Sequence, residues 1–178
     1  PRLAGADYTL SVALAGQGRV EEAEACIRRA LQHRPRSAGT FSNLLFNSGY
    51  SIRSDAAERL AEARRYGLLL QSLVKEKYVQ WGCAASPVKL RVGFVGGDFY
   101  SHPVGFFLES VLDELGKGDV ELCAYPTANR TDSLTERLKQ RCTKWTSLAE
   151  LDDAEAAALI HADSLHVLID LAGHTADN

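Results

Sequence analysis

Side chains able to move protons gather in two short segments, each directly after an apolar run. The first run, residues 90–95, leads into a Gly-Gly-Asp turn and a His-Pro pair, and the second, residues 165–171, leads into Gly-His-Thr. The candidate residues are two aspartates, two histidines and a threonine: Asp98, His102, Asp170, His174 and Thr175. Histidine has an unperturbed pKa of about 6.5 and can accept a proton near neutral pH, so these residues favour general acid–base chemistry. Their spacing alone does not indicate a metal site.

An alternating pattern of strands and helices must position these residues. We predict strands at 90–95, 120–125 and 165–171 with a short one at 144–146, and helices at 104–115, 133–142 and 153–162. Strands that alternate with helices of about ten residues indicate a parallel, doubly wound sheet. Right-handed crossovers put the carboxyl ends of all strands on one edge, so both candidate segments should meet there.

Several common nucleotide and hydrolase motifs are missing from the first segment. Gly93, Gly96 and Gly97 do not follow the G-x-G-x-x-G spacing, and neither a Gly-Lys-Ser/Thr phosphate loop nor a G-x-S-x-G elbow occurs in the sequence. The sequence therefore argues against a Rossmann oxidoreductase, a nucleotide hydrolase and an esterase.

Each candidate also has a structural interpretation. Asp98 could close a turn, His102 could cap the helix that follows it, and Asp170 could bond backbone amides at the end of a strand. The other three histidines have no reactive neighbours in the sequence and are assigned to the surface or to ordinary packing: His33, His161 and His166.

The first forty residues have the pattern of a tetratricopeptide repeat. Gly18, Ala23, Ala30 and Pro35 match the second half of that repeat, and a shift of about 34 residues, its period, aligns the start of the chain with a further helix near Ser37. A generic helical hairpin is the alternative. Because one and a half repeats are not stable alone, we expect more repeats before the first residue.

An amphipathic helix is predicted over residues 56–81, and the segment 82–88 marks a boundary. We expect the apolar stripe of this helix to pack against the neighbouring domain. The predicted domains are a repeat end at 1–50, a linker helix at 51–88 and a Rossmann-like amino-terminal catalytic lobe, incomplete, at 89–178.

Composition limits the classes of partner. The net charge of −3 and the absence of Lys/Arg clusters argue against nucleic acid, and the apolar runs are too short to span a membrane. The four cysteines lack C-x-x-C spacing and are expected to be reduced thiols, so we expect a cytoplasmic protein: Cys26, Cys83, Cys123 and Cys142.

The two motifs LRVGFVGGDFYSHPVGFF and LHVLIDLAGHTADN, after tetratricopeptide helices, resemble the O-linked N-acetylglucosamine transferase and SPINDLY-like family. The catalytic region of that family begins with LRVG(Y/F)VS-x-DF and a His-Pro pair, and later carries a DL-x-GHT motif. This sequence differs at Gly96 and Gly97, where the family often has serines. The resemblance implies tetratricopeptide hairpins followed by the first part of a GT-B amino-terminal lobe.

The resemblance also implies an activity and a set of residue roles. It implies an inverting, metal-independent transfer of a sugar from a nucleotide sugar, with no other cofactor, to Ser or Thr of a protein bound on the repeats and in the cleft. His102 would act as general base with Asp170 as a rival proton acceptor, and the residues implied to bind substrate are Asp98, Pro103, His174 and Thr175. The family's diphosphate-binding lysine would lie beyond residue 178, so this segment alone should be inactive.

Other functions stay open at this point. UDP-N-acetylglucosamine is the expected donor, but GDP-fucose, UDP-glucose and UDP-galactose serve relatives, and some relatives modify asparagine. A non-catalytic tetratricopeptide scaffold, or a different enzyme on the same sheet such as a sugar epimerase or a phosphate-ester enzyme, would use the same elements in another way.

Overall fold

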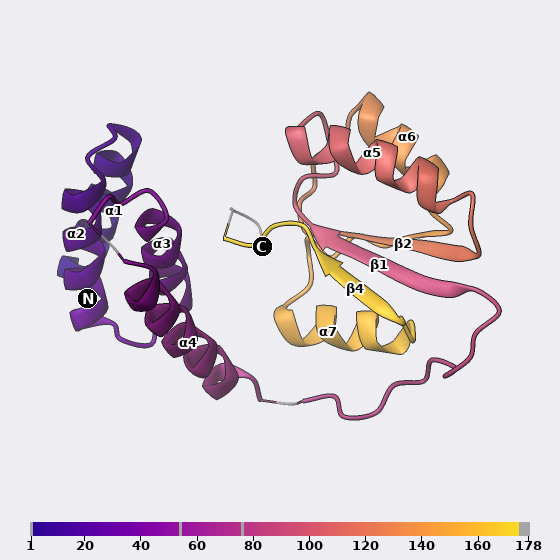
Figure 1. Ribbon diagram of the computed structural model, residues 1–178, viewed down its shortest axis with the longest axis horizontal. Helices are drawn as coiled ribbons and strands as arrows, with labels where there is room; N and C mark the ends of the chain where they lie inside the picture. The colour runs from indigo at the N-terminus through magenta and orange to yellow at the C-terminus, as the bar shows by residue number, and fades with distance from the viewer. Residues whose placement is uncertain (1, 54, 76, 175–178) are drawn as a thin grey trace. The chain divides into compact units, whose positions relative to one another are not determined.

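The structure, a computed structural model, describes residues 2–53, 55–75 and 77–174 (Figure 1). The chain divides into two compact units, Pro1–Lys77 and Tyr78–Asn178, which we call unit 1 and unit 2. Of the helices in the described ranges, none is both long enough and apolar enough to cross a membrane.

Unit 1 consists of α1 (Arg2–Gly16), α2 (Val20–His33), α3 (Ala38–Ser48) and α4 (Ala56–Leu73). Gly18 takes the positive φ of 74° in the turn between α1 and α2, a conformation that favours glycine. The small residues of the repeat pattern, Ala23 and Ala30, are both buried, and this lets the first helices approach closely.

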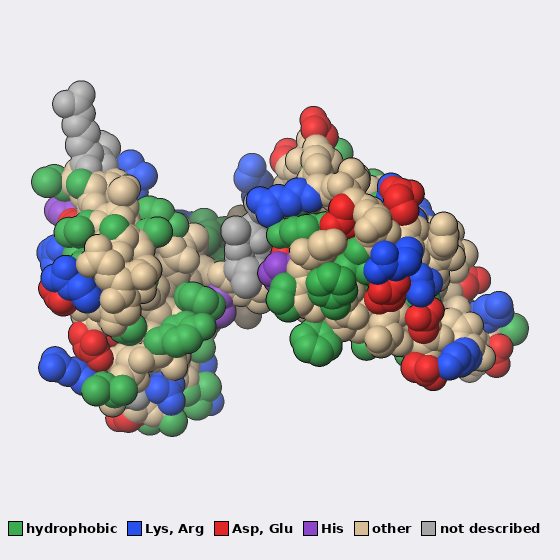
Figure 2. Space-filling view, turned by 90° about the horizontal axis from the view of Figure 1, so that it is seen from above, with side chains coloured by type: hydrophobic (Ala, Val, Ile, Leu, Met, Phe, Trp, Pro, Cys, Tyr) green, Lys and Arg blue, Asp and Glu red, His purple; other side chains and the backbone are tan. Residues whose placement is uncertain are grey.

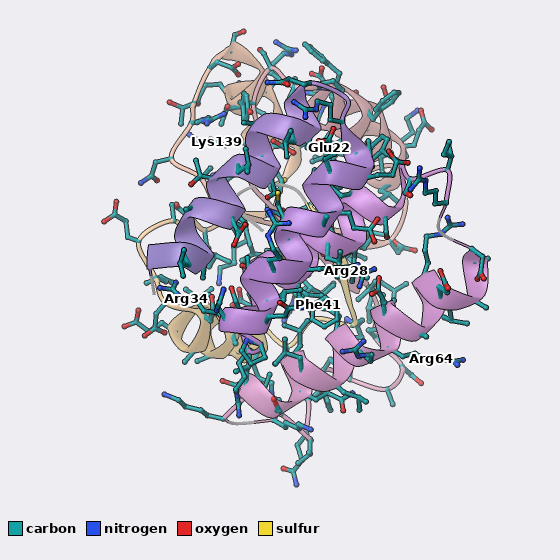
Figure 3. All side chains as sticks on the ribbon, turned by 90° about the vertical axis from the view of Figure 1, so that its left-hand side faces the viewer. Glu22, Arg28, Arg34, Phe41, Arg64 and Lys139 are labelled. Atoms are coloured by element: carbon teal, nitrogen blue, oxygen red, sulfur yellow. The ribbon has the colours of Figure 1, made fainter. Side chains whose placement is uncertain are left out.

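Helix α4 is shorter than predicted and packs on the repeat helices. It ends at Leu73 rather than at residue 81, with Val74 in an extended conformation. Its Tyr66 and Leu69 join the core around Phe41 on α3, and Arg28 on α2 reaches Glu62 with an N–O distance of 2.6 Å. Figure 3 shows Arg28 and Phe41 among these helices. The apolar stripe thus contributes to unit 1.

Unit 2 contains one parallel sheet. Its strands β1 (Leu90–Gly96), β2 (Val120–Pro126), β3 (Lys144–Trp145) and β4 (Val167–Asp170) lie in the order β3-β2-β1-β4. Every paired strand is parallel to its neighbour. The predicted class, helical hairpins followed by a doubly wound parallel sheet, is confirmed.

Helices cover both faces of this sheet (Figure 1). Helices α5 (Pro103–Leu115) and α6 (Ser133–Arg141) lie on one face, and α7 (Asp153–Ala162) lies on the other. Helices α6 and α7 each begin with an aspartate in a capping box, where its carboxylate accepts backbone N–H groups of the first turn: Asp132 for α6 and Asp152 for α7.

The strand side chains alternate between two cores. Phe94 and Leu122 face the core shared with α5 and α6, whereas Cys123 and Tyr125 face the core shared with α7. Because successive residues of a strand point to opposite faces, a strand buried on both sides is apolar throughout, which explains the unbroken runs of β1 and β2. Strand β4, at the edge of the sheet, is apolar but exposed.

The segment before β1 is held on unit 2 by histidines. His161 on α7 stacks on Tyr78 with 4.0 Å between ring centroids, and its Nε2 lies 2.6 Å from the carbonyl oxygen of Gln80. The Nε2 of His166 lies 3.2 Å from the carbonyl oxygen of Ala84, in the same segment. These two histidines have the packing role expected of them, and the aromatic contact explains why residues 78–81 leave the helical pattern.

Candidate functional site

The site begins where β1 ends at the carboxyl edge of the sheet. The Gly96 carbonyl accepts a hydrogen bond of 3.0 Å from the Thr127 N–H, which joins the ends of β1 and β2. The chain then turns through residues 97–101 and enters α5. Phe99, at the middle of this turn, is 2% exposed and meets Trp145 edge to face with 5.3 Å between ring centroids. A buried aromatic side chain therefore anchors the turn that carries Asp98 and His102.

The structure brings Asp98 and His102 together. His102 is the residue before helix α5, and its Nδ1 lies 3.4 Å from Oδ2 of Asp98. The same Nδ1 accepts a hydrogen bond from the backbone N–H of Val104, 3.4 Å away, so His102 caps α5. The His102 side chain is 36% exposed and the Asp98 side chain 16% exposed. The pair is thus open to a reactant on the histidine side.

This geometry gives the imidazole two competing arrangements. With the proton on Nδ1, the ring donates to Asp98 and keeps its lone pair on Nε2, free to accept a proton from a reactant. With the proton on Nε2, the ring caps α5 at Val104. The structure shows the second arrangement, in which Nδ1 accepts from the Val104 N–H. A proton on Nδ1 would instead face the Asp98 carboxylate 3.4 Å away, as in other pairs of a carboxylate and a histidine. His102 can therefore act as a base as well as a cap.

Asp170 lies at the same edge, one strand away. It is paired in register with Val95 of β1, so β4 ends where the turn to α5 begins (Figure 1). A Cβ placed on Gly96 would lie 3.2 Å from Cβ of Leu171, which shows that the two segments touch. The Oδ1 of Asp170 accepts a hydrogen bond of 2.8 Å from the Ala172 N–H. Within the described ranges, no hydrogen bond or ion pair joins Asp170 to His102.

The remaining predicted site residues are placed as follows. Pro103 is the first residue of α5, where its fixed φ suits the helix start, and it is exposed. His174 follows Gly173 in the turn after β4 and is also exposed. Thr175 lies outside the described residues. Substrate binding by Asp98, Pro103 and His174 stays a prediction.

The start of α6 holds the turn in place, a role that the sequence did not reveal. The Asp132 carboxylate accepts hydrogen bonds from the Ser101 N–H at 2.7 Å and from the Thr135 N–H at 3.0 Å. Hydrogen bonds from Ser101 and from the Thr135 backbone hold the pKa of Asp132 well below its usual range. The buried Thr135 hydroxyl donates to the Phe99 carbonyl at 2.8 Å. The sequence predicts a helix from residue 133, but gives no sign of the contact between Asp132 and Ser101.

Gly105 lets the turn lie against the first turn of α5. A Cβ at this position would lie well inside contact distance of the Tyr100 carbonyl oxygen, 3.0 Å from the Asp98 carbonyl oxygen and 3.1 Å from Cδ2 of Leu134. A glycine inside a helical pattern is the sequence signal for such a close approach. Gly105 is therefore a positioning residue for Asp98 and His102.

We found no cluster of three or more His, Cys, Asp or Glu side chains suited to a metal ion within the described part of the chain. Asp98, His102 and Asp170 at this edge are side chains able to transfer protons.

Comparison with known proteins gives a consistent family assignment. Residues 37–178 match the pattern of the family described as Glycosyl transferase family 41. The chain is similar to proteins named probable UDP-N-acetylglucosamine–peptide N-acetylglucosaminyltransferase SPINDLY. The protein from Arabidopsis thaliana is 25% identical over 149 residues, and that from Eustoma exaltatum subsp. russellianum is 29% identical over 150 residues. Each match covers 81% of this chain and 16% of the relative.

A solved structure has the same fold. A mutant of the Thermobaculum terrenum O-GlcNAc transferase superposes with a TM-score of 0.83 and 28% sequence identity. The match covers 93% of this chain and 32% of that protein. The chain thus spans about a sixth of the curated relatives and a third of the solved protein.

Proposed function

The chain belongs to glycosyl transferase family 41, and on this basis we propose that the whole protein transfers a sugar from a nucleotide sugar to polypeptide acceptors. The observation that carries the proposal is the Asp98–His102 pair at the carboxyl edge of the parallel sheet, inside the region that matches the family. Ligands of open α/β sheets bind at this edge. We propose UDP-N-acetylglucosamine as the donor, because the similar SPINDLY proteins carry that donor in their names.

The proposed reaction is a single displacement that inverts the anomeric carbon. The acceptor hydroxyl oxygen forms a bond to the anomeric carbon while the bond from that carbon to the diphosphate oxygen breaks, and the diphosphate leaves with the electron pair. Nε2 of His102 takes the hydroxyl proton, and Asp98 stabilises the imidazolium that results. The Asp170 carboxylate, at the same edge, is the rival acceptor of this proton.

We place the groups that neutralise the departing diphosphate outside this chain and assign the step no metal. The described residues of unit 2 then have one task in the reaction, which is to orient and deprotonate the acceptor hydroxyl. Positioned general bases of this kind contribute about 10²–10⁴-fold to a rate.

The proposed acceptor is a Ser or Thr residue of a protein that also contacts the repeat helices of unit 1. Stacked helical repeats offer an extended surface for a polypeptide, which supports this assignment. We propose the cytoplasm as the compartment, because Cys26, Cys83, Cys123 and Cys142 are all free thiols.

Donor turnover by the whole protein tests the proposal. Purified protein is incubated with UDP-N-acetylglucosamine, GDP-fucose, UDP-glucose and UDP-galactose, and release of the nucleotide is followed with and without protein acceptors. We expect release from UDP-N-acetylglucosamine, and a large decrease in the His102→Ala variant. Release of the nucleotide from another donor would support the transferase activity but would change the assignment of the transferred sugar. If the protein neither binds nor turns over any donor, the scaffold interpretation replaces this one.

A further inference from the structure

An arginine beside the site has no carboxylate partner among the described residues. Unit 2 has four arginines, and three of them pair with acidic side chains: Arg91, Arg137 and Arg141. Arg130, in the loop between β2 and α6, instead donates a hydrogen bond of 2.8 Å from Nη1 to the Tyr100 hydroxyl. Its guanidinium carbon also lies 5.2 Å from the centre of the Tyr100 ring. The phenol orients Arg130 without neutralising its charge.

This arginine is linked to His102 through one aromatic ring. The rings of Tyr100 and His102 are 5.7 Å apart, and Tyr100 lies within the turn that carries Asp98. Arg130 is exposed, so its remaining donors face solvent next to the proposed base. A guanidinium in this setting suits a carboxylate, which it can bind through two parallel N–H groups.

Two aromatic side chains are exposed within the first five residues of α5, which follows His102 in the sequence. Phe106 is 55% exposed and Phe107 is 76% exposed, and the Phe106 N–H donates to the His102 carbonyl at 3.0 Å. Large aromatic side chains in such positions are typical of recognition surfaces. Figure 2 shows hydrophobic and basic side chains exposed on this face of unit 2.

We propose that these two pairs, Tyr100–Arg130 and Phe106–Phe107, form an acceptor surface on both sides of His102. It would bind a polypeptide segment with a carboxylate on one side of the modified hydroxyl and an apolar side chain on the other. The proposal rests on the proposed function, and it adds the class of acceptor sequence. The combination of one cation with exposed aromatic rings favours a polypeptide over the donor diphosphate, which requires several converging donors and no apolar contact.

The test compares short peptides with one central serine and different neighbours. One series carries Asp, Ala or Lys on one side of the serine, and the other carries Phe or Ala on the opposite side. The whole protein should transfer sugar to the Asp peptide with a kcat/KM about tenfold above that of the Ala peptide, as expected for one hydrogen-bonded charge. The Phe peptide should exceed its Ala partner several-fold.

Variants then assign each preference to its residue. Arg130→Glu should reverse the preference so that the Lys peptide exceeds the Asp peptide, and Phe107→Ala should abolish the preference for Phe. Lys117→Ala and Leu90→Ala are the matched controls: both side chains are exposed, and Lys117 follows the end of α5 that is remote from His102, whereas Leu90 lies at the start of β1. Neither control should alter the preferences. Equal thermal midpoints of all variants exclude unfolding as the cause.

Hydrolysis of the donor in the absence of peptide separates the outcomes. The rate of this hydrolysis in the Arg130→Glu and Phe107→Ala variants should stay within about twofold of the wild-type rate. If the wild type turns over no donor, the proposed function fails before the acceptor surface is tested. If donor turnover is normal and peptide preferences are absent or unchanged in the variants, the acceptor surface is wrong. Loss of hydrolysis in Arg130→Glu would assign this arginine to the donor and overturn the proposal.

One further measurement tests whether the surface is open. Hydroxyl-radical labelling of the whole protein should modify Phe107 without peptide and modify it less with the Phe peptide. If Phe107 is already protected without peptide, another segment of the protein covers this face, and the proposal is overturned.

Discussion

Replacing Gly105 by alanine should damage both the fold and the activity, although alanine is the better helix former. Relative to alanine, glycine inside a helix costs about 0.5–1 kcal/mol, so helix propensity alone predicts a more stable protein. At Gly105, however, the added Cβ would lie 3.0 Å from the Asp98 carbonyl oxygen and closer still to that of Tyr100. The steric contact of the added Cβ therefore lowers the free energy of unfolding, whereas the helix propensity of alanine raises it.

The size of the effect follows from the contact. A carbon and a carbonyl oxygen do not approach much closer than about 3.3 Å, so the turn would have to retreat from α5 by about 1 Å. Overpacking of this kind costs about 1–3 kcal/mol in the free energy of unfolding. A displacement of about 1 Å at a catalytic group reduces a rate by roughly 10²-fold. We expect both losses, because the displaced turn carries Asp98 and leads into His102.

Urea unfolding measures the first loss, and kcat for donor turnover by the whole protein measures the second. Gly67→Ala is the control: it makes the same change inside α4, where a Cβ would meet no atom within 4 Å. It should stabilise the protein by about 0.5–1 kcal/mol and leave kcat unchanged. A Gly105→Ala variant as stable and active as the wild type would refute the packing argument. A less stable variant with normal kcat would show that the position of the turn does not matter for the reaction.

Three further predictions concern single side chains. Asp98→Asn should lower kcat for sugar transfer about tenfold to a hundredfold, with little change in KM for the donor, because the amide cannot stabilise the charged ring of His102; an unchanged kcat would remove Asp98 from the account. Because the pKa of Asp132 is lowered in the folded state, its contribution to stability is present above the unfolded pKa of about 3.9 and is lost as the pH falls through the folded value. The free energy of unfolding of Asp132→Asn should therefore depend less steeply on pH below about pH 4 than that of the wild type, and equal slopes would contradict this assignment. Burial raises the pKa of the Cys142 thiol to about 12, so alkylation at about pH 8 followed by mass spectrometry should label Cys83 before Cys142 in the folded protein, and the reverse order would contradict the burial of Cys142.

The sheet was predictable because each buried strand is an apolar run followed by turn residues and a helix. Phe94 and Cys123 face opposite cores, and the sequence signals this burial on two sides directly. The end of α4 was not predictable in this way. Leu70 and Val74 continue the helical spacing, but Tyr78 finds its partner in His161, which is distant in the sequence. Tertiary contacts of this kind override local propensity.

The candidate site, like the fold, was predictable from the sequence only in part. The parallel topology places Asp170 and the turn with His102 at one edge, and that follows from the order of the elements. The contact of Ser101 with Asp132 joins two loops that the sequence does not connect, so only the folded structure reveals it. The role of Arg130 was equally unpredictable, because the sequence does not show which arginines pair with a carboxylate.

The role of His102 as the general base is tested by the rate of sugar transfer from UDP-N-acetylglucosamine to a protein acceptor, measured for the whole protein and for its His102→Ala variant. We expect kcat to fall by about 10²–10⁴ while KM for the donor stays the same, because the base acts on the acceptor proton in the transition state. A variant that retains the wild-type kcat, or that changes only in KM, would contradict the assignment of His102 as the base.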